Sequence, residues 1–204
     1  MKVCFICSEY PPSLNGGIGI FTKELSEALI AQGHSVKVVG LYRGKTRQES
    51  INGVEIYRLG KLDVPFGWMI DLLRLRSLIR RWARMGIIEV LEDNDWESLS
   101  SSIGKIKIPV VLRIHNRFLA KITNLDTLGF VKKNQLKQAL RNCAMVVGVS
   151  QNILDSLTNF VQLRSSCVIY NGVQVPAKIP SFAEREEGQV MFAGTLVEEK
   201  GIVR

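Results

Sequence analysis

The sequence predicts an α/β fold with a doubly wound, mostly parallel sheet. Apolar, β-branched runs alternate along the chain with segments of helical periodicity, which is typical of strands joined by crossover helices. Several of these runs, such as 2–7 and 109–114, are apolar on successive residues rather than on alternate ones. Such runs indicate strands with helices on both faces, as in a parallel sheet.

Each predicted element rests on a local pattern. Apolar runs predict strands at 2–7, 35–41, 54–59, 86–91, 109–114, 145–150 and 167–170. Helical periodicity predicts a helix that begins near Ile18 and further helices over 67–85, 127–141 and 150–157. Gly33 is a favourable residue for ending the first helix, and Ser150 is a good N-cap for the last.

Length and composition limit the class of protein. The chain has 204 residues, of which 46% are hydrophobic and 23% charged, as in globular proteins with a sizeable core. No apolar run reaches the roughly 18 to 20 residues that cross a bilayer, and the N-terminal run is too short for a signal peptide. We therefore expect a cytoplasmic protein.

The charge balance indicates an anionic partner. The chain carries 27 Lys and Arg residues against 19 Asp and Glu residues, a net charge of +8. A phosphorylated ligand, an anionic membrane surface or a nucleic acid would suit this charge. Because the sequence has neither zinc-finger spacing nor a convincing aromatic RNA-binding motif, we expect no nucleic acid.

The four cysteines predict buried, reduced thiols. Cys4 and Cys7 form a C-x-x-C pair, but a separation of three residues in a strand puts their side chains on opposite faces. The sequence has no second ligand pair at zinc spacing and only two histidines. We therefore expect no bound metal, and we interpret Cys143 and Cys167 as buried, reduced thiols as well.

A change of composition predicts a domain boundary. Residues 1–172 carry the alternating strands and helices, whereas 173–188 hold prolines, a charge cluster and little periodicity, which is typical of a linker. A further strand is expected at 189–194, so 189–204 would be the start of a second domain.

Residues 9–25, EYPPSLNGGIGIFTKEL, place three glycines between the first strand and the first helix. The first N–H groups of a helix have no internal partner, and the helix dipole adds partial positive charge there. Glycines at this point let a ligand approach the backbone closely. The loop therefore predicts an anion cradle, most often one for phosphate.

Other interpretations of this loop fit less well. A dinucleotide-binding fingerprint would need a small residue where Thr22 stands, and an acid rather than basic residues after the second strand. A P-loop would need the G-x-x-x-x-G-K-[ST] pattern, which the sequence lacks. A flexible turn without a ligand remains the simplest alternative for glycines taken alone.

Five stretches together are more specific than the glycines. They are EYPPSLNGGIG with the later GHSVKV (9–19, 33–38), PVVLRIHNRF (109–118), VVGVSQNI (146–153), VIYNGV (168–173) and VMFAGTLVEEKG (190–201). Their residues and order resemble the retaining glycosyltransferases of the group 1 (family 4) type, which have the GT-B fold. The resemblance covers the whole chain.

The resemblance implies an enzyme that moves a sugar from a nucleotide-diphosphate donor to an acceptor with retention of configuration and without a cofactor or metal. Residues 1–172 would be its Rossmann-like, acceptor-side domain, and 189–204 the beginning of its donor-binding domain. The acceptor would be a carbohydrate, a lipid-linked molecule or another small compound. We expect the 204-residue chain by itself to fold but to transfer no sugar.

The same resemblance implies roles for individual residues. His115 matches the family's functional histidine and would act near the transferred sugar, and Gly16, Gly17 and Lys200 would bind the donor diphosphate. Thr195 stands where the family has an arginine, a departure within the phosphate site. The acceptor-binding candidates lie beside the glycine loop and at strand ends: Glu9, Tyr10, Asn15, Asp95 and Asn116. Asn171 and Gly172 are expected to form a turn.

Two further patterns allow more than one interpretation. The acidic stretch 89–97 could be a glycosidase or metal site, but we favour an acidic loop after a strand that lines the cleft. In 67–86, one helical face carries Trp68, Leu72, Leu75, Ile79 and Trp82, and arginines lie largely opposite. This helix either lies on an anionic bilayer or covers the sheet.

Two other functions compete with the transferase. They are a non-catalytic nucleotide- or anion-binding module and, less well supported, a nicotinamide-dependent dehydrogenase. The dehydrogenase is disfavoured because no acidic residue follows the second strand at the position that would bind a ribose hydroxyl.

Overall fold

The computed structural model describes residues 1–13, 16–115, 130–158, 161–173, 175, 181 and 188–194, with only the backbone for 130–133. The chain forms two compact units, residues 1–172 and 173–204. The fold described below is that of the first unit. In the second unit, the described residues 188–194 contain no strand, although the sequence predicts one at 189–194. The assignments of 173–188 and 189–204 stay predictions.

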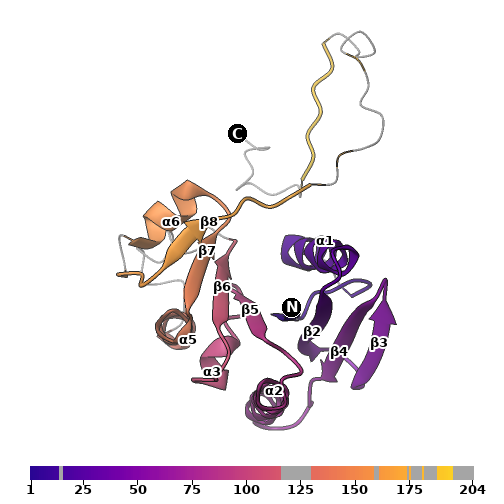
Figure 1. Cartoon of the computed structure of the whole chain (residues 1–204), viewed down its shortest axis with the longest axis vertical. Helices are drawn as coiled ribbons and strands as arrows, with labels where there is room; N and C mark the ends of the chain where they lie inside the picture. Colours follow the sequence, from indigo (N-terminus) through magenta and orange to yellow (C-terminus); the bar gives the residue numbers. More distant parts are fainter. Residues whose placement is uncertain are drawn as a thin grey trace. The chain divides into compact units, whose positions relative to one another are not determined.

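The first unit is built on one eight-stranded sheet (Figure 1). Its strands are β1 (Lys2–Ile6), β2 (Ser35–Tyr42), β3 (Arg47–Ile51), β4 (Val54–Gly60), β5 (Val90–Asn94), β6 (Val110–Ile114), β7 (Met145–Gly148) and β8 (Ser166–Val168). The strand order is β3-β4-β2-β1-β5-β6-β7-β8, and β3 is antiparallel to β4 whereas all other pairs are parallel. This topology confirms the predicted doubly wound α/β fold.

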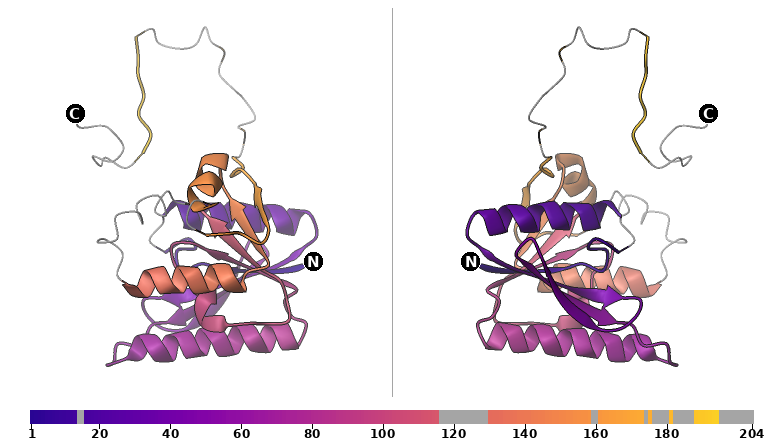
Figure 2. Two further views of the ribbon diagram at one scale, coloured as in Figure 1. Left: turned by 90° about the vertical axis from the view of Figure 1, so that its left-hand side faces the viewer. Right: turned by 90° about the vertical axis from the view of Figure 1, so that its right-hand side faces the viewer.

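Helices cover both faces of this sheet. They are α1 (Gly17–Ala31), α2 (Gly67–Arg84), the short α3 (Ser100–Ile103), α5 (Phe130–Asn142) and α6 (Gln151–Thr158). The larger core cluster joins the sheet to α2, α5 and α6, and the smaller one joins β1, β2 and β4 to α1. In Figure 2, α1 and α2 lie on opposite sides of the sheet. Within the described residues, no helix is long and apolar enough to cross a membrane.

Several local signals act as the sequence predicts. Gly33 ends α1 in the left-handed conformation at φ 82°, and the N–H of His34 donates to the Leu29 carbonyl at 3.0 Å. Ser150 Oγ accepts the N–H of Ile153 at 3.3 Å and so caps α6. Cys4 and Cys7 belong to different core clusters, on opposite faces of β1, and all four cysteines are free thiols.

Two strands differ from the prediction. The polar strand β3 was not predicted, because an edge strand needs no continuous apolar run. The sequence did hold a signal for it, since Asn52-Gly53 forms the hairpin turn between β3 and β4, with φ values of 50° and 82°. Strand β5 begins at Val90 rather than at Gly86. Glu92 and Asp93 therefore lie inside the strand and not in a loop after it.

Candidate functional site

A pocket of about 390 Å³ opens at the carboxyl edge of the sheet. It lies at the topological switch point, because β2, β4 and β3 follow on one side of β1 and β5 to β8 on the other (Figure 1). The described residues that line it are Glu9, Gly16, Gly17, Ile18, Trp96, His115 and Asn171. We call this the switch-point pocket.

The glycine loop forms one wall of this pocket. Gly16 is the N-cap of α1, with φ −90° and ψ 173°, and its carbonyl accepts the N–H of Ile20 at 3.3 Å. No described side chain caps this end of α1, so the dipole and the first N–H groups are available to a ligand.

The three glycines serve different purposes. A Cβ on Gly19 would lie 2.1 Å from the Glu9 carbonyl oxygen, so Gly19 is needed for the helix to pack on the loop. A Cβ on Gly16 would meet the Glu9 carboxylate at 2.3 Å, which is the mobile end of a side chain. A Cβ on Gly17 would meet nothing within 4 Å, and Gly17 has no positive φ. Gly17 therefore does not form a left-handed turn; it is the first residue of α1.

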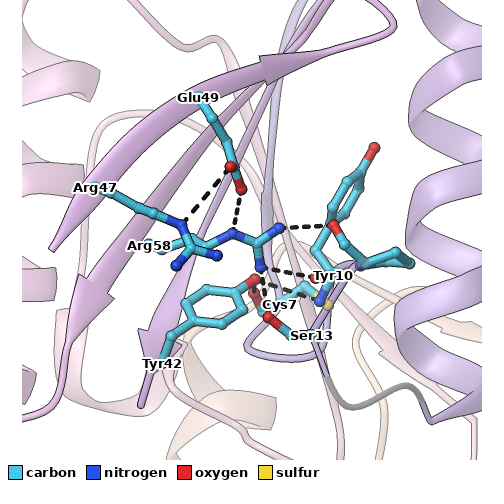
Figure 3. Close-up of polar contacts among 8 residues, drawn as sticks. Cys7, Tyr10, Ser13, Tyr42, Arg47, Glu49 and Arg58 are labelled. Carbon is cyan, nitrogen blue, oxygen red and sulfur yellow. Dashed lines mark hydrogen bonds and ion pairs between the residues drawn. The ribbon is translucent and has the colours of Figure 1, made fainter. Parts of the chain in front are cut away.

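A buried arginine holds the loop between β1 and α1 (Figure 3). Arg58, in β4, donates from Nη1 to the Tyr10 carbonyl and to Ser13 Oγ, both at 2.8 Å, and from Nη2 to the Pro11 carbonyl at 2.6 Å. Its Nε donates to the carboxylate of Glu49 on β3. Charge-assisted bonds of this kind are strong and directional, so β4 fixes the path of the loop.

Tyr42 at the end of β2 completes this support. Its ring lies under the Arg58 guanidinium at 4.6 Å, and its hydroxyl donates to the Cys7 carbonyl at 2.5 Å. The backbone N–H of Tyr10 donates to the same hydroxyl at 3.3 Å. Sequence analysis missed Arg58, whose only signal was a cation inside the apolar run VEIYRL.

Tyr10 itself lies in the core rather than in the pocket. Its side chain is fully buried in the cluster beneath α1. The contribution of this residue to the loop comes from its backbone, which bonds Arg58 and Tyr42. The buried position of the side chain does not support the predicted contact with an acceptor, which stays a prediction.

His115 follows β6 and faces α1 across the pocket. Its backbone N–H donates to Asp95 Oδ1 at 3.0 Å, which ties the end of β6 to the loop after β5. Its ring meets Phe21 of α1 edge to face, with centroids 4.9 Å apart. Arg113, two residues earlier in β6, lies over the same Phe21 ring and is bound by Glu92 at 2.6 and 3.2 Å.

This environment keeps the His115 imidazole uncharged at neutral pH. Burial lowers its pKa to about 4, and the nearby Arg113 guanidinium adds to the effect. A neutral imidazole carries one N–H donor and one acceptor nitrogen, and both can serve hydroxyl groups.

The low pKa of His115 predicts a pH effect on stability. Between pH 6.5 and 4 the unfolded chain binds a proton at residue 115 and the folded chain does not, so lowering the pH removes stability. We expect the free energy of unfolding of wild type, relative to His115→Gln, to fall over this window by up to about 3 kcal/mol. Urea unfolding at several pH values measures it, and parallel pH curves would contradict the low pKa.

The acidic stretch 89–97 is mainly structural. Glu92 pairs with Arg113, and Asp93 accepts the N–H groups of Ser100 and Asn94 at 2.7 and 2.9 Å. Burial raises the pKa of Asp93 to about 7. Glu97 accepts the N–H of Ser8 at 3.1 Å, and burial raises its pKa as well. The interpretation of the whole stretch as a cleft loop is wrong, because its first half is strand β5.

The switch-point pocket brings together some predicted site residues and adds others. Glu9, Gly16, Gly17 and His115 line it, whereas Asp95 supports it through the His115 backbone. Trp96 was not predicted, and Asn171, which was assigned to a turn, also lines the pocket. The predicted residues Asn15, Asn116 and Lys200 lie outside the described residues. Among the described residues, no group of three His, Cys, Asp or Glu side chains could hold a metal ion.

Comparison with known proteins supports the family that the motifs of the sequence indicate. Residues 15–175 match the family described as Glycosyltransferase Family 4. An uncharacterized glycosyltransferase of Methanocaldococcus jannaschii is 23% identical over 224 residues, which cover 99% of this chain and 57% of the relative.

Solved structures support the same fold. Sucrose-phosphate synthase from Thermosynechococcus elongatus is similar with a TM-score of 0.67 at 16% identity, over 83% of this chain and 48% of that one. The catalytic domain of starch synthase IV from Arabidopsis thaliana, bound to ADP and acarbose, has a TM-score of 0.56 at 14% identity, over 85% of this chain and 52% of that one. The chain thus spans about half the length of these relatives.

The family match includes the start of α1 and its glycines, His115 after β6, and Asn171 at the far wall of the pocket. The sheet order and the structural neighbours are those of GT-B glycosyltransferases. The chain therefore belongs to Glycosyltransferase Family 4 and has the fold of the N-terminal domain of a GT-B glycosyltransferase.

Proposed function

We propose that this chain is the acceptor-side domain of an enzyme that transfers a sugar from a nucleotide-diphosphate donor with retention of configuration. The observation that carries the proposal is the switch-point pocket, where an uncapped helix N-terminus and a neutral histidine line the same space. The helix N-terminus suits a phosphate group, and the neutral histidine suits the hydroxyl groups of a sugar. Family membership supports transfer rather than binding alone.

The N-terminus of α1 would stabilise the donor diphosphate. Negative charge develops on this group as it leaves, and preorganised N–H donors lower the energy of that charge more than water does. Gly17 suits this role because its missing side chain leaves the first helical turn open to the pocket. Lys200, outside the described residues, is proposed to neutralise the same phosphates.

His115 would act on the transferred sugar. In its neutral form it can exchange hydrogen bonds with a sugar hydroxyl and adds no positive charge beside an oxocarbenium-like transition state. Asp95 would act through the backbone of His115 by holding the end of β6. One wall of the pocket would therefore bind the leaving diphosphate, and the other would bind the transferred sugar.

Glu9, Trp96 and Asn171 would bind the acceptor. The Glu9 carboxylate accepts hydrogen bonds, and the Asn171 amide both donates and accepts them. Trp96 is 47% exposed, and the flat face of an indole packs well on the apolar face of a sugar ring. That the similar starch synthase is bound to ADP and acarbose agrees with a nucleotide and a carbohydrate as ligands of this fold.

The full-length protein that carries this domain can test the proposal. We expect one member of a panel of UDP-, GDP- and ADP-sugars to release its nucleotide diphosphate only when a sugar-like acceptor is present. The product should keep the anomeric configuration of the donor, which proton NMR of the anomeric signal reports directly. The opposite configuration would contradict retention. Nucleotide binding without transfer for any donor and acceptor would favour a non-catalytic binding module instead.

A further inference from the structure

The outer face of α2 exposes an unusual number of large apolar side chains. Phe66 is 72% exposed and Leu73 59%, and Met69 and Ile70 lie exposed between them. They occupy the start of α2 and the residue before it. Isolated exposed apolar residues are ordinary, but a contiguous group on one face marks an interaction surface.

The outer face of α2 differs from the apolar face that the sequence periodicity indicates as a candidate for membrane contact. Leu75, Ile79 and Trp82 are buried in the larger core cluster, and Leu72 packs against it. The apolar stripe recognised in the sequence is therefore the inner face of α2, which covers the sheet. Only Trp68 of that stripe is largely exposed; it lies at the N-terminal end of the inner face, seven residues before Leu75, and is not part of the outer face.

The same outer face becomes basic along the helix. Leu73, Arg76, Arg80 and Arg84 line a shallow pocket on α2, and Arg80 and Arg84 also line a second one with Lys105 and Lys107. No acidic residue is among the described residues that line either pocket. The single carboxylate of α2, Asp71, is buried and bound to Arg74 and the Leu62 N–H. These cations therefore face solvent without counter-charges from their own helix.

Phe66 adds a second sign that the surface is used. Its φ of 58° places it in the left-handed region, which bulky residues rarely adopt and which glycine or asparagine adopts readily. The strained backbone presents an aromatic ring to solvent rather than to the core. Core packing gives no reason for a phenylalanine there.

We propose that the outer face of α2, defined by Phe66, Met69, Ile70, Leu73, Arg76, Arg80 and Arg84 with Lys105 and Lys107, docks on the surface of an anionic lipid bilayer. The apolar side chains would enter the boundary between headgroups and acyl chains, and the cations would meet lipid phosphates. Figure 2 shows α2 along one side of the domain, with no other described element beyond it.

The chemistry of this face favours a bilayer over other partners. Nucleic-acid interfaces are polar and strongly basic, so the exposed Phe66 and Leu73 do not suit one. A second copy of this chain would bring the same arginines and lysines together and repel them. The apolar side chains at one end of this helix face suit the boundary between headgroups and acyl chains. The cations at the other end, which form no salt bridge with a described carboxylate, suit acidic headgroups.

Vesicle co-sedimentation of the 204-residue chain tests this proposal. We expect binding to vesicles of equal parts phosphatidylcholine and phosphatidylglycerol, and binding at least about tenfold weaker to phosphatidylcholine alone. Added salt should weaken the binding to anionic vesicles. Equal binding to both vesicle types, or none to either, would overturn the proposal.

Paired variants locate the contact on α2. Arg76→Gln, Arg84→Gln and Lys107→Gln together should weaken binding on the order of 100-fold, since each cation near an anionic surface contributes about fivefold. The control removes the same charge from exposed sites elsewhere, by Arg43→Gln, Lys45→Gln and Arg164→Gln, and should retain most of the binding. Equal losses in the two triple variants would mean that net charge alone attracts the chain, which would overturn the proposed face.

Phe66→Asn separates docking from folding. Asparagine suits the left-handed backbone at this position, so unfolding in urea should show equal or greater stability. Binding to anionic vesicles should fall about tenfold because an inserted aromatic ring is lost. Unchanged binding would overturn the role of Phe66. A dimer in analytical ultracentrifugation that Phe66→Asn and Leu73→Ser abolish, with lipid binding unaffected, would assign the face to a second copy.

Discussion

Gly17→Val in the full-length protein is expected to lower kcat/KM for the nucleotide-sugar donor by about 100- to 1,000-fold. The added side chain would stand at the first residue of α1, where a Cβ meets no atom within 4 Å, and would fill the space proposed for the diphosphate. The free energy of unfolding should change by less than about 1 kcal/mol, since Gly17 has no positive φ and the helix tolerates a side chain there.

Gly19→Val provides the contrast two residues away. Its Cβ would collide with the Glu9 carbonyl oxygen at 2.1 Å, so this variant should lose stability as well as activity. Steady-state kinetics and urea unfolding on both variants separate the two effects. If Gly17→Val retains the wild-type kcat/KM for its donor, the glycine loop is only a turn and the proposed diphosphate site is wrong.

Arg58→Met is expected to lower the free energy of unfolding by about 3 to 5 kcal/mol. The substitution fills similar space but leaves the carbonyls of Tyr10 and Pro11 and the Ser13 hydroxyl without their donor. Arg58 is 1% exposed, so water cannot readily replace these bonds. Urea unfolding measures the loss, and hydrogen exchange should show faster opening at the N–H groups of Tyr10 and Ser13.

Arg47→Met is the matched control for this change. Arg47 contacts the same Glu49 carboxylate at 3.7 Å, but its side chain is 53% exposed. An exposed pair of this kind contributes less than about 1 kcal/mol. Equal losses in the two variants would mean that the Glu49 ion pair, and not the bonds to the loop, carries the effect of Arg58.

The glycine loop and His115 were predictable because each is tied to a local pattern. A buried strand followed by glycines and an amphipathic helix indicates an anion cradle wherever it occurs. His115 ends an apolar run, and parallel strands end at the same edge of a sheet. Trp96 carried no such signal, since its place in the pocket depends on which strand lies beside β1.

Tyr10 and Arg58 illustrate the opposite case. Tyr10 lies beside the glycines in the sequence and was expected to face a ligand, yet its ring packs in the core. Arg58 lies 45 to 48 positions away from the loop residues that it binds and nevertheless fixes the path of the loop. Side-chain direction at an irregular loop follows from contacts with distant strands, which periodicity cannot report.

The sequence by itself determined the α/β class, the parallel sheet, the limits of α1 and α6, and the family, because these depend on local periodicity, capping residues and the order of motifs. Only the tertiary structure decided that β1, β5, β6 and β8 bring Glu9, Trp96, His115 and Asn171 into one pocket. It also decided that the apolar stripe of α2 faces the sheet while Phe66 and Leu73 face outward. Strand neighbours and buried faces are set by long-range packing of the whole domain. A hydrophobic period of 3.6 or 2 residues therefore identifies an element as a helix or a strand but does not determine which other elements it contacts.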